Sequence, residues 1–449
     1  MSIPVWEYDV AYYRALMEPT GLDIRTDPVK GKGLFTRRAW AKGEVVHMES
    51  CLCCTQNLDD ANRGVPVCGN CLVSLESPQE IVRRVSGKAY VGSMPAIEAY
   101  RPPEALGCLN ALTSDSDACT AVYCSVRCRE QAWTKHHYAL CQAKMTPKSV
   151  AALAAFMGHS WTESGVDFSD THFLALKFIG MVISRHRMHR MPLEQAYAPV
   201  AQLIRSPLQK FAFSYLLMED YEESVGIKRD IDKADAERYL EFKTYQFKPP
   251  EDNPVVLHAR AKGPTRDHMM VEAIALLNDI FVFSPEEAAF FTPERWSSLL
   301  GAVLLNGQER SPNSPYTDYA FIAKKSGNAS ALRSFQGNLR SNGIDTSKLD
   351  GSTRGQGVYT IGACFNHSCD PNVQVSYCNQ NDETLVVLAL RDIAAEEELF
   401  ISYIDEAKPF IHRQQQLFEH YLFTCLCTKC QREAPTAPDA MATSEKSDS

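Results

Sequence analysis

The sequence has little that would suit a membrane protein, a secreted protein or a nucleic-acid-binding protein. None of its apolar stretches approaches the length of a membrane span. The first residues carry Glu7 and Asp9 and lack the basic start and apolar run of a signal peptide. Asp and Glu (55) outnumber Lys and Arg (46), and the net charge of −9 argues against a phosphate-binding surface. We therefore expect a soluble protein of the cytoplasm, the nucleus or both, without direct contact to nucleic acid or membrane.

Internal repeats are also missing, so a helical-repeat domain is not expected. The 449 residues exceed what one hydrophobic core usually holds, which predicts two or three compact units. Residues 433–449 are rich in Ala, Pro, Ser and Thr and are predicted to be a disordered tail.

What the sequence does have is 16 cysteines. They indicate either disulfides in a secreted protein or metal ligands in a reducing compartment. Many lie two or three residues from another cysteine, a spacing that suits two ligands on one ion better than a bridge to a distant strand. Zinc is therefore the favoured explanation.

The first cysteine cluster consists of two short Cys pairs and a closing His-x3-Cys. Nearby thiolates in such a series can occupy adjacent corners of one zinc tetrahedron. A set of free buried cysteines is the alternative, but it rarely produces so ordered a series by chance. The candidate ligands are Cys68, Cys71, Cys119, Cys124, Cys128, His137 and Cys141.

The second cluster, Cys425, Cys427 and Cys430, supplies three corners of a tetrahedron and needs a fourth ligand. Cys369, in the stretch Asn366-His367-Ser368-Cys369, is the candidate. Each motif is weak alone, but each supplies what the other lacks.

Hydrophobic patterns predict further elements. Residues 34–39 and 44–48 are predicted to form a hairpin, with Gly43 at positive φ in its turn. Residues 150–300 are predicted to be helical, with Ser284-Pro285-Glu286-Glu287 as a helix start. Residues 311–357 are rich in Ser, Asn and Gly and are predicted to be a long loop.

Nearer the C-terminus, residues 385–390 and 399–403 are predicted to be strands, and residues 412–423 a helix. Glu396-Glu397-Glu398 is interpreted as a charged turn before the second strand.

In order along the chain, these motifs resemble the SET-and-MYND family of lysine methyltransferases, in particular its divergent fifth branch, which lacks a C-terminal helical-repeat domain. The motifs that carry the resemblance are Lys30-Gly31-Lys32-Gly33-Leu34, the first cysteine cluster, Asn306-Gly307-Gln308, residues 362–372, residues 398–403 and residues 421–427.

The resemblance implies an α+β protein: a SET-domain β-fold with a pseudoknot, an inserted MYND-like zinc module, a helical insert and a zinc-binding post-SET segment. The expected units are the SET N-terminal part (20–66), the MYND-like module (67–141), the helical insert (150–300), the SET catalytic core (301–405), the post-SET segment (406–432) and the disordered tail (433–449).

By the same resemblance, the MYND-like module holds two zinc ions. Cys68, Cys71, Cys124 and Cys128 would bind the first; Cys119, His137, Cys141 and a residue three positions before Cys119 would bind the second. That position is Ser116, a poor ligand, so Cys108 is favoured in its place. Asp115, Asp117 or a weak or empty site remain alternatives. Cys51, Cys53 and Cys54 have no assigned ligand role and are interpreted as buried strand-end cysteines.

The resemblance also implies the cofactor, S-adenosylmethionine, and the residues around it. Lys30, Gly31, Lys32 and Gly33 would lie along its methionine and ribose part. Asn366 and His367 would hydrogen-bond it, and Tyr421 and Phe423 would form channel walls and a surface for adenine. Tyr403 would be the active-site tyrosine.

Methyl transfer to lysine needs an in-line arrangement and a neutral amine, both of which a desolvated channel supplies. No catalytic metal is needed, so two to three zinc ions are expected to be structural. The expected substrate is a histone or another basic protein, a ribosomal protein included, and the protein is expected to be a monomer. The alternative is a catalytically idle SET/MYND zinc scaffold that binds proline-containing peptides at the MYND-like module.

Overall fold

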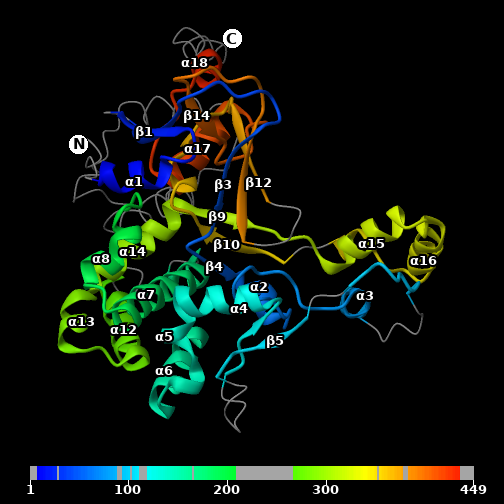
Figure 1. Cartoon of the computed structure of the whole chain (residues 1–449), viewed down its shortest axis with the longest axis horizontal. Helices are drawn as coiled ribbons and strands as arrows, with labels where there is room; N and C mark the ends of the chain where they lie inside the picture. Colours follow the sequence, from blue (N-terminus) through cyan, green and yellow to red (C-terminus); the bar gives the residue numbers. More distant parts are fainter. Residues whose placement is uncertain are drawn as a thin grey trace, which may run out of the picture.

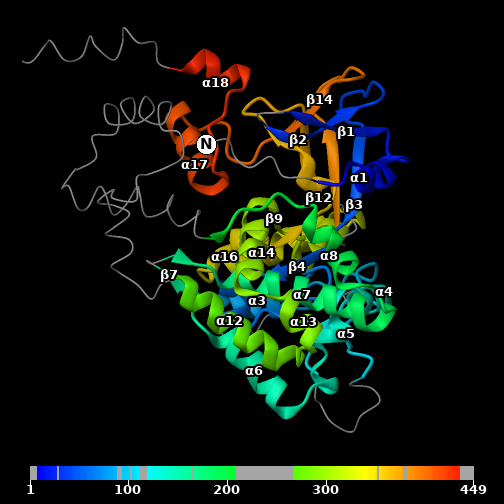
Figure 2. The same ribbon diagram turned by 90° about the vertical axis from the view of Figure 1, so that its left-hand side faces the viewer.

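The structure is a computed structural model. It describes residues 8–27, 30–87, 94–101, 104–110, 119–163, 166–208, 266–350, 353–377 and 383–434. Asp115, Ser116 and Asp117 and nearly all of the predicted tail lie outside this part. Small β-sheets and the C-terminal helices occupy one end of the body, and a bundle of helices occupies the other (Figures 1 and 2).

Three small sheets form the β part, and their strand orders are β1-β2-β14-β11, β4-β10-β9 and β12-β13-β3. The strands are β1 (Leu22–Asp27), β2 (Gly31–Thr36), β3 (Val45–Ser50), β4 (Cys53–Gln56), β9 (Gly307–Arg310), β10 (Gly355–Val358), β11 (Asn366–His367), β12 (Val373–Tyr377), β13 (Thr384–Ala389) and β14 (Glu398–Ile401). Two short pairs, β5 (Leu106–Gly107) with β6 (Val122–Tyr123) and β7 (Thr162–Glu163) with β8 (Val166–Asp167), lie outside them.

The predicted hairpin is wrong, although both of its strands exist. β2 pairs with β1 and β14, whereas β3 pairs with β13 in another sheet. Between them, Trp40 forms an isolated bridge with Ile393, and Gly43 has the expected positive φ, +82°. The turn at Gly43 therefore has the predicted conformation, but β2 and β3 each pair with strands from other parts of the chain and not with each other. The predicted strand at 385–390 is confirmed as β13, which is central in its sheet and mostly buried.

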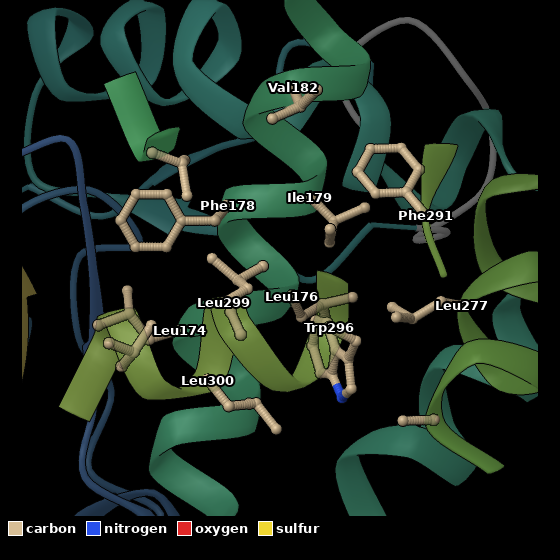
Figure 3. Packing of buried hydrophobic residues seen from close by; sticks show 14 of the residues in the cluster. Leu174, Leu176, Phe178, Ile179, Val182, Leu277, Phe291, Trp296, Leu299 and Leu300 are labelled. Carbon is tan, nitrogen blue, oxygen red and sulfur yellow. The ribbon is translucent and has the colours of Figure 1, made fainter. Parts of the chain in front are cut away.

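The prediction that residues 150–300 are helical holds for most of their described part, where the short strand pair β7-β8 interrupts the helices; residues 209–265 lie outside the described part. Ser284 caps its helix with Glu287 in the predicted capping box. Side chains of the long helix α7, among them Phe178 and Ile179, pack against Leu299 and Trp296 in one large apolar core (Figure 3). The helices are α6 (Pro147–Gly158), α7 (Ser169–His189), α8 (Leu193–Ala201), α12 (Arg266–Phe281), α13 (Pro285–Phe290) and α14 (Pro293–Asn306).

The predicted loop at 311–357 is also wrong. It contains α15 (Pro315–Lys325), α16 (Ala329–Ser341) and β10. Leu332, Phe335 and Leu339 of α16 recur at helical spacing and are buried, while Ser, Asn and Gly occupy the outer face. Both helices pack with α3 (Pro78–Ser86) around a separate apolar cluster that extends to one side of the body (Figure 1).

The remaining helices are short. They are α1 (Val10–Met17), α2 (Leu58–Asn62), α4 (Val126–Ala132), α5 (Tyr138–Leu140), α17 (Phe410–Tyr421), which confirms the helix expected near 412–423, and α18 (Thr428–Glu433). A π-helical turn, η1 (Trp133–His137), and 3₁₀ turns η2 (Gln142–Lys144), η3 (Thr346–Asp350) and η4 (Gly362–Cys364) complete the list. Within the described ranges, each helix is too short or too polar to cross a membrane.

Candidate active site and metal centres

Three sequence motifs that lie far apart along the chain occupy neighbouring strands of one sheet. β14 pairs with the glycine-containing strand β2, opposing Leu399 to Leu34. On its other side, β14 runs parallel to β11, where His367 opposes Ile401. The chain leaves β14 two residues before Tyr403. This sheet therefore brings the Gly-x-Gly motif, Asn366-His367 and Tyr403 to one region.

The glycines of β2 meet different demands. Gly31 has φ +78°, which a side chain would strain, and the space beyond it is open. A Cβ on Gly33 would come within 2.8 Å of Asn366 Nδ2 and of Glu398 Oε1. These two side chains hydrogen-bond each other at 3.0 Å, and Glu398 also pairs with Lys30. Gly33 therefore leaves room for a polar cluster at the edge of the site.

Lys32 carries a buried ammonium, with only 3% of the residue exposed. Its Nζ donates to Tyr13 Oη at 2.8 Å and to the carbonyl oxygen of Gln202 at 2.6 Å. No described carboxylate is among the groups that act on it; burial lowers its pKa, and the neighbouring Cys364 thiol opposes that shift. A buried cation without a counter-ion favours an anionic ligand. The methionine carboxylate of S-adenosylmethionine has the required charge, so this part of the site fits that cofactor.

His367 connects Tyr403 to a cysteine cluster. Its Nδ1 accepts a hydrogen bond from the backbone N–H of Tyr403 at 3.0 Å, and its Nε2 lies 3.3 Å from Cys369 Sγ. Because Nδ1 is an acceptor, the neutral ring carries its hydrogen on Nε2 and donates it to the sulfur. Burial lowers the pKa of His367 to about 4, which keeps the ring neutral near pH 7.

Four rings form what we call the aromatic cluster: His367, Tyr403, Tyr421 and Phe423. The ring centroid of Tyr403 lies 5.3 Å from His367, 4.8 Å from Tyr421 and 6.4 Å from Phe423. Tyr403 donates its hydroxyl hydrogen to the carbonyl of Phe365 at 2.5 Å, and Tyr421 donates to the carbonyl of Tyr403 at 3.3 Å. Burial raises the pKa of Tyr403, so its hydroxyl stays protonated. The cluster offers an apolar wall with two hydroxyls that are held by hydrogen bonds.

The first metal-ligand group contains Cys68, Cys71, Cys124 and Cys128. Cys124 Sγ lies 3.5 Å from both Cys71 Sγ and Cys128 Sγ. Two thiolates at adjacent corners of a zinc tetrahedron are separated by roughly 3.8 Å. The group therefore has the composition and size of a tetrahedral zinc site.

The second group contains Cys108, Cys119, His137 and Cys141, all buried. His137 Nε2 lies 3.1 Å from Cys108 Sγ and 3.6 Å from Cys119 Sγ, and the sulfurs of Cys108 and Cys141 are 3.6 Å apart. Cys108 thus stands where the resemblance expects a residue three positions before Cys119. The π-helical turn that ends at His137 contributes to this arrangement.

The third group contains Cys369, Cys425, Cys427 and Cys430. Cys369 lies two residues after the end of β11, and its sulfur lies 3.5 Å from that of Cys430. In each of the three groups, all ligand atoms lie within 4.8 Å of one another. Zinc held by four protein ligands has no open position, so it stabilises structure rather than binding a substrate.

The sequence motifs assigned no site role to two sets of residues, three buried cysteines and Glu398. Cys51, Cys53 and Cys54 are buried at the end of β3 and in β4 and belong to none of the three groups in the described chain. Glu398 was read as part of a charged turn but is the first residue of β14 and contacts Lys30 and Asn366. The sequence signal is the apolar run Leu399-Phe400-Ile401, and the two glutamates before Glu398 hide the fact that the strand already begins at Glu398.

Comparison with known proteins agrees with this geometry. The profile of the SET domain matches residues 31–404. The mouse protein-lysine N-trimethyltransferase SMYD5 is 27% identical over 432 residues, which cover 94% of this chain and 88% of the relative. The histone-lysine N-methyltransferase ATXR2 of Arabidopsis thaliana is 27% identical over 361 residues, 76% of this chain and 66% of the relative.

A SET and MYND domain-containing protein of Dictyostelium discoideum is 45% identical over 96 residues, 21% of this chain and 18% of the relative. The profile match and the strand arrangement together show that the chain belongs to the SET-domain family. Within that family its relatives place it in the SET and MYND group, near the fifth member. The predicted α+β fold with zinc-binding modules is confirmed.

Proposed function

We propose that this protein is an S-adenosylmethionine-dependent protein-lysine N-methyltransferase. The observation that carries the proposal is the meeting of β2, β11 and Tyr403 in one sheet region, beside a buried ammonium and an aromatic wall. Lysine methyltransferase names among relatives that span most of the chain support it.

The side chains have distinct proposed roles. When bound, S-adenosylmethionine supplies a methyl group on an electrophilic sulfonium. Lys32 would bind the carboxylate of the cofactor, and the backbone of residues 30–33 together with Asn366 and His367 would help to hold it. Positioning two reactants in line supplies most of the rate in such a displacement.

The aromatic cluster acts on the incoming lysine. An apolar wall disfavours the charged ammonium and so lowers the lysine pKa, which yields the neutral amine needed for attack. The Tyr403 hydroxyl would orient this amine and stabilise the polarised sulfonium, and Tyr421 and Phe423 would form the channel wall and a surface for adenine. The third cysteine group holds these segments in place, and none of the three zinc groups does chemistry.

The proposed substrate is a lysine on a basic protein, a histone or a ribosomal protein. The net charge of −9 favours such a partner, and one relative is named for histone lysine. We further propose a monomer of the cytoplasm or nucleus whose MYND-like module, residues 67–141, docks proline-containing peptides.

The test is methyl transfer by the Tyr403→Phe protein. We expect it to bind S-adenosylmethionine within about threefold of wild type and to lose at least about 100-fold in turnover with a cell extract as substrate. Tyr319→Phe is the matched control, since its hydroxyl also donates to a carbonyl, that of Pro95, but lies in the separate helical cluster.

Turnover should be unchanged in Tyr319→Phe. If Tyr403→Phe also keeps its turnover, Tyr403 has no catalytic role. If the wild-type protein transfers no methyl group from labelled S-adenosylmethionine to any protein in the extract, the proposed activity is wrong.

A further inference from the structure

Each cysteine group receives an N–H donor from outside its ligands. Asn70 Nδ2 lies 3.6 Å from Cys128 Sγ in the first group, and Asn110 Nδ2 lies 3.4 Å from Cys141 Sγ in the second. In the third group, the donor at Cys430 Sγ is Arg413 Nη2, at 3.8 Å. The third group therefore has a cation where the others have a neutral amide.

The positive charge of Arg413 distinguishes it from the asparagine amides at the other two groups. Four thiolates around Zn²⁺ carry a net charge of −2, and burying that charge is costly unless other groups offset it. Arg413 is 1% exposed, so little water separates its guanidinium from the sulfurs. A guanidinium keeps its charge at any physiological pH. It can therefore offset part of the thiolate charge at close range.

Arg413 is held firmly in this position. It lies in the first turn of α17, where Nη1 donates to the carbonyl of Lys408 and Nη2 to Glu433 Oε2, each at 2.6 Å. These two bonds fix the guanidinium beside the third group, where Nη2 also faces Cys430 Sγ.

The next residue of α17 holds the same loop through its backbone. Gln414 Nε2 donates to the carbonyl of Cys425 at 2.9 Å, and Gln414 Oε1 accepts from the N–H of Cys425 at 2.8 Å. One turn of α17 thus contacts both the thiolates and the main chain of the loop. Phe423, two residues before Cys425, belongs to the aromatic cluster.

We propose that Arg413 is a positioning residue of the third zinc site: its guanidinium offsets the thiolate charge, and with Gln414 it fixes the 425–430 loop against α17. The zinc part of this inference stands independently of the proposed methyl transfer. Outer-shell partners of metal ligands typically contribute 10- to 100-fold to metal affinity.

The experiment measures loss of zinc cysteine by cysteine. Full-length zinc-loaded protein is incubated with a chelator and an alkylating reagent, and the modified peptides are quantified by mass spectrometry over time. In Arg413→Gln, we expect alkylation at Cys425, Cys427 and Cys430 to be at least about tenfold faster than in wild type. Alkylation of the cysteines between 68 and 141 should not change.

Two further variants separate the guanidinium from its neighbours. Glu433→Gln removes the other charge at Arg413 but leaves the sulfur contact, so rates should stay within about twofold of wild type. Arg413→Lys keeps the charge but loses the planar fork. Its third-site cysteines should react faster than in wild type and more slowly than in Arg413→Gln, and this variant decides the matter if Arg413→Gln does not fold.

Wild-type rates at the third site in both Arg413 variants would overturn the proposal. Equal acceleration at all three groups would also overturn it, because Arg413 would then stabilise the whole fold rather than this site. Either result leaves the proposed methyl transfer untouched, since no substrate or methyl donor is used.

Discussion

The two MYND-like zinc groups and the third zinc group have similar ligands, but they connect different parts of the chain. The first two groups take all eight ligands from residues 68–141, a local stretch whose apolar clusters consist largely of the cysteines themselves. The third joins Cys369, two residues after β11, to Cys425, Cys427 and Cys430 near the C-terminus. In residues 68–141, zinc takes the place of a hydrophobic core. In the third group, zinc ties the C-terminal segment to the sheet β1-β2-β14-β11, which we call the SET sheet.

The surroundings of the third group show what this fastening serves. Its cysteines share an apolar cluster with Ile404, Phe410 and Leu417, and Tyr403, Tyr421 and Phe423 pack against that cluster. His367 connects Cys369 to the backbone of Tyr403. Losing the third zinc should therefore damage the active site, whereas losing a MYND-like zinc should damage mainly its own module.

Cys369→Ser should give the largest effect. We expect zinc per chain to fall from three to two, because a serine hydroxyl replaces one thiolate of the group. Methyl transfer should fall by at least about 100-fold, because β11 and the aromatic cluster lose their common anchor. Metal analysis and a methylation assay on the same preparation check this. Normal transfer with two zinc ions would remove the third site from the active site.

Gly33→Ala should reproduce the functional loss without the loss of zinc. The added Cβ meets Asn366 Nδ2 and Glu398 Oε1 at 2.8 Å and displaces this polar pair. We expect affinity for S-adenosylmethionine, measured by calorimetry, to weaken by about tenfold. Zinc should stay at wild-type content. Unchanged affinity would show that the strand edge does not face the cofactor.

Cys108→Ser tests the other half of the comparison. It should also remove one zinc ion, from the second MYND-like group. Methyl transfer to a protein substrate should stay within about threefold of wild type, because this group contributes no segment to the SET sheet. A loss as large as that of Cys369→Ser would erase the distinction between the two regions.

Acid stability separates the zinc regions from the helical insert. His172 stacks on Trp161 with centroids 4.2 Å apart, and burial lowers its pKa to about 3. Below pH about 6.5 the unfolded chain binds a proton that the folded chain refuses, so stability falls as pH falls, by up to about 1.4 kcal/mol per pH unit.

Urea unfolding at pH 7 and pH 5 should show about 2 kcal/mol more acid loss in wild type than in His172→Phe. The acid loss that remains in the variant then belongs to other titrating groups, among them the thiolates and the buried His136 and His367, whose pKa values burial also lowers. An identical pH dependence in both proteins would mean that His172 is protonated in the folded state.

The sequence predicted ligand groups better than it predicted strand pairing, and the reasons are physical. Ligands of one ion must lie close together, so the spacing of Cys425, Cys427 and Cys430 already indicates a shared centre. Strand partners depend on tertiary contacts, so the predicted hairpin of β2 and β3 was wrong although its turn was right. Cys108 needed a contact across a loop that no fixed spacing reveals.

Residues 311–357 were wrongly predicted to be a loop because of their amino-acid composition. Serines, asparagines and glycines on the outer face of α16 outweighed the apolar residues at helical spacing on its inner face. Lys32 shows a related limit: its place in the motif was predicted, but its burial beside Tyr13 and Gln202 depends on α1 and the end of α8, which no local pattern connects to it.

The most direct measurement is an experimental structure of the full-length, zinc-loaded protein with S-adenosylhomocysteine. We expect the ligand carboxylate at the Lys32 ammonium and the ligand sulfur directed toward the Tyr403 hydroxyl, with zinc bound by Cys369 and the three C-terminal cysteines. A ligand that contacts none of Lys32, His367 and Tyr403 would contradict the site described for this chain.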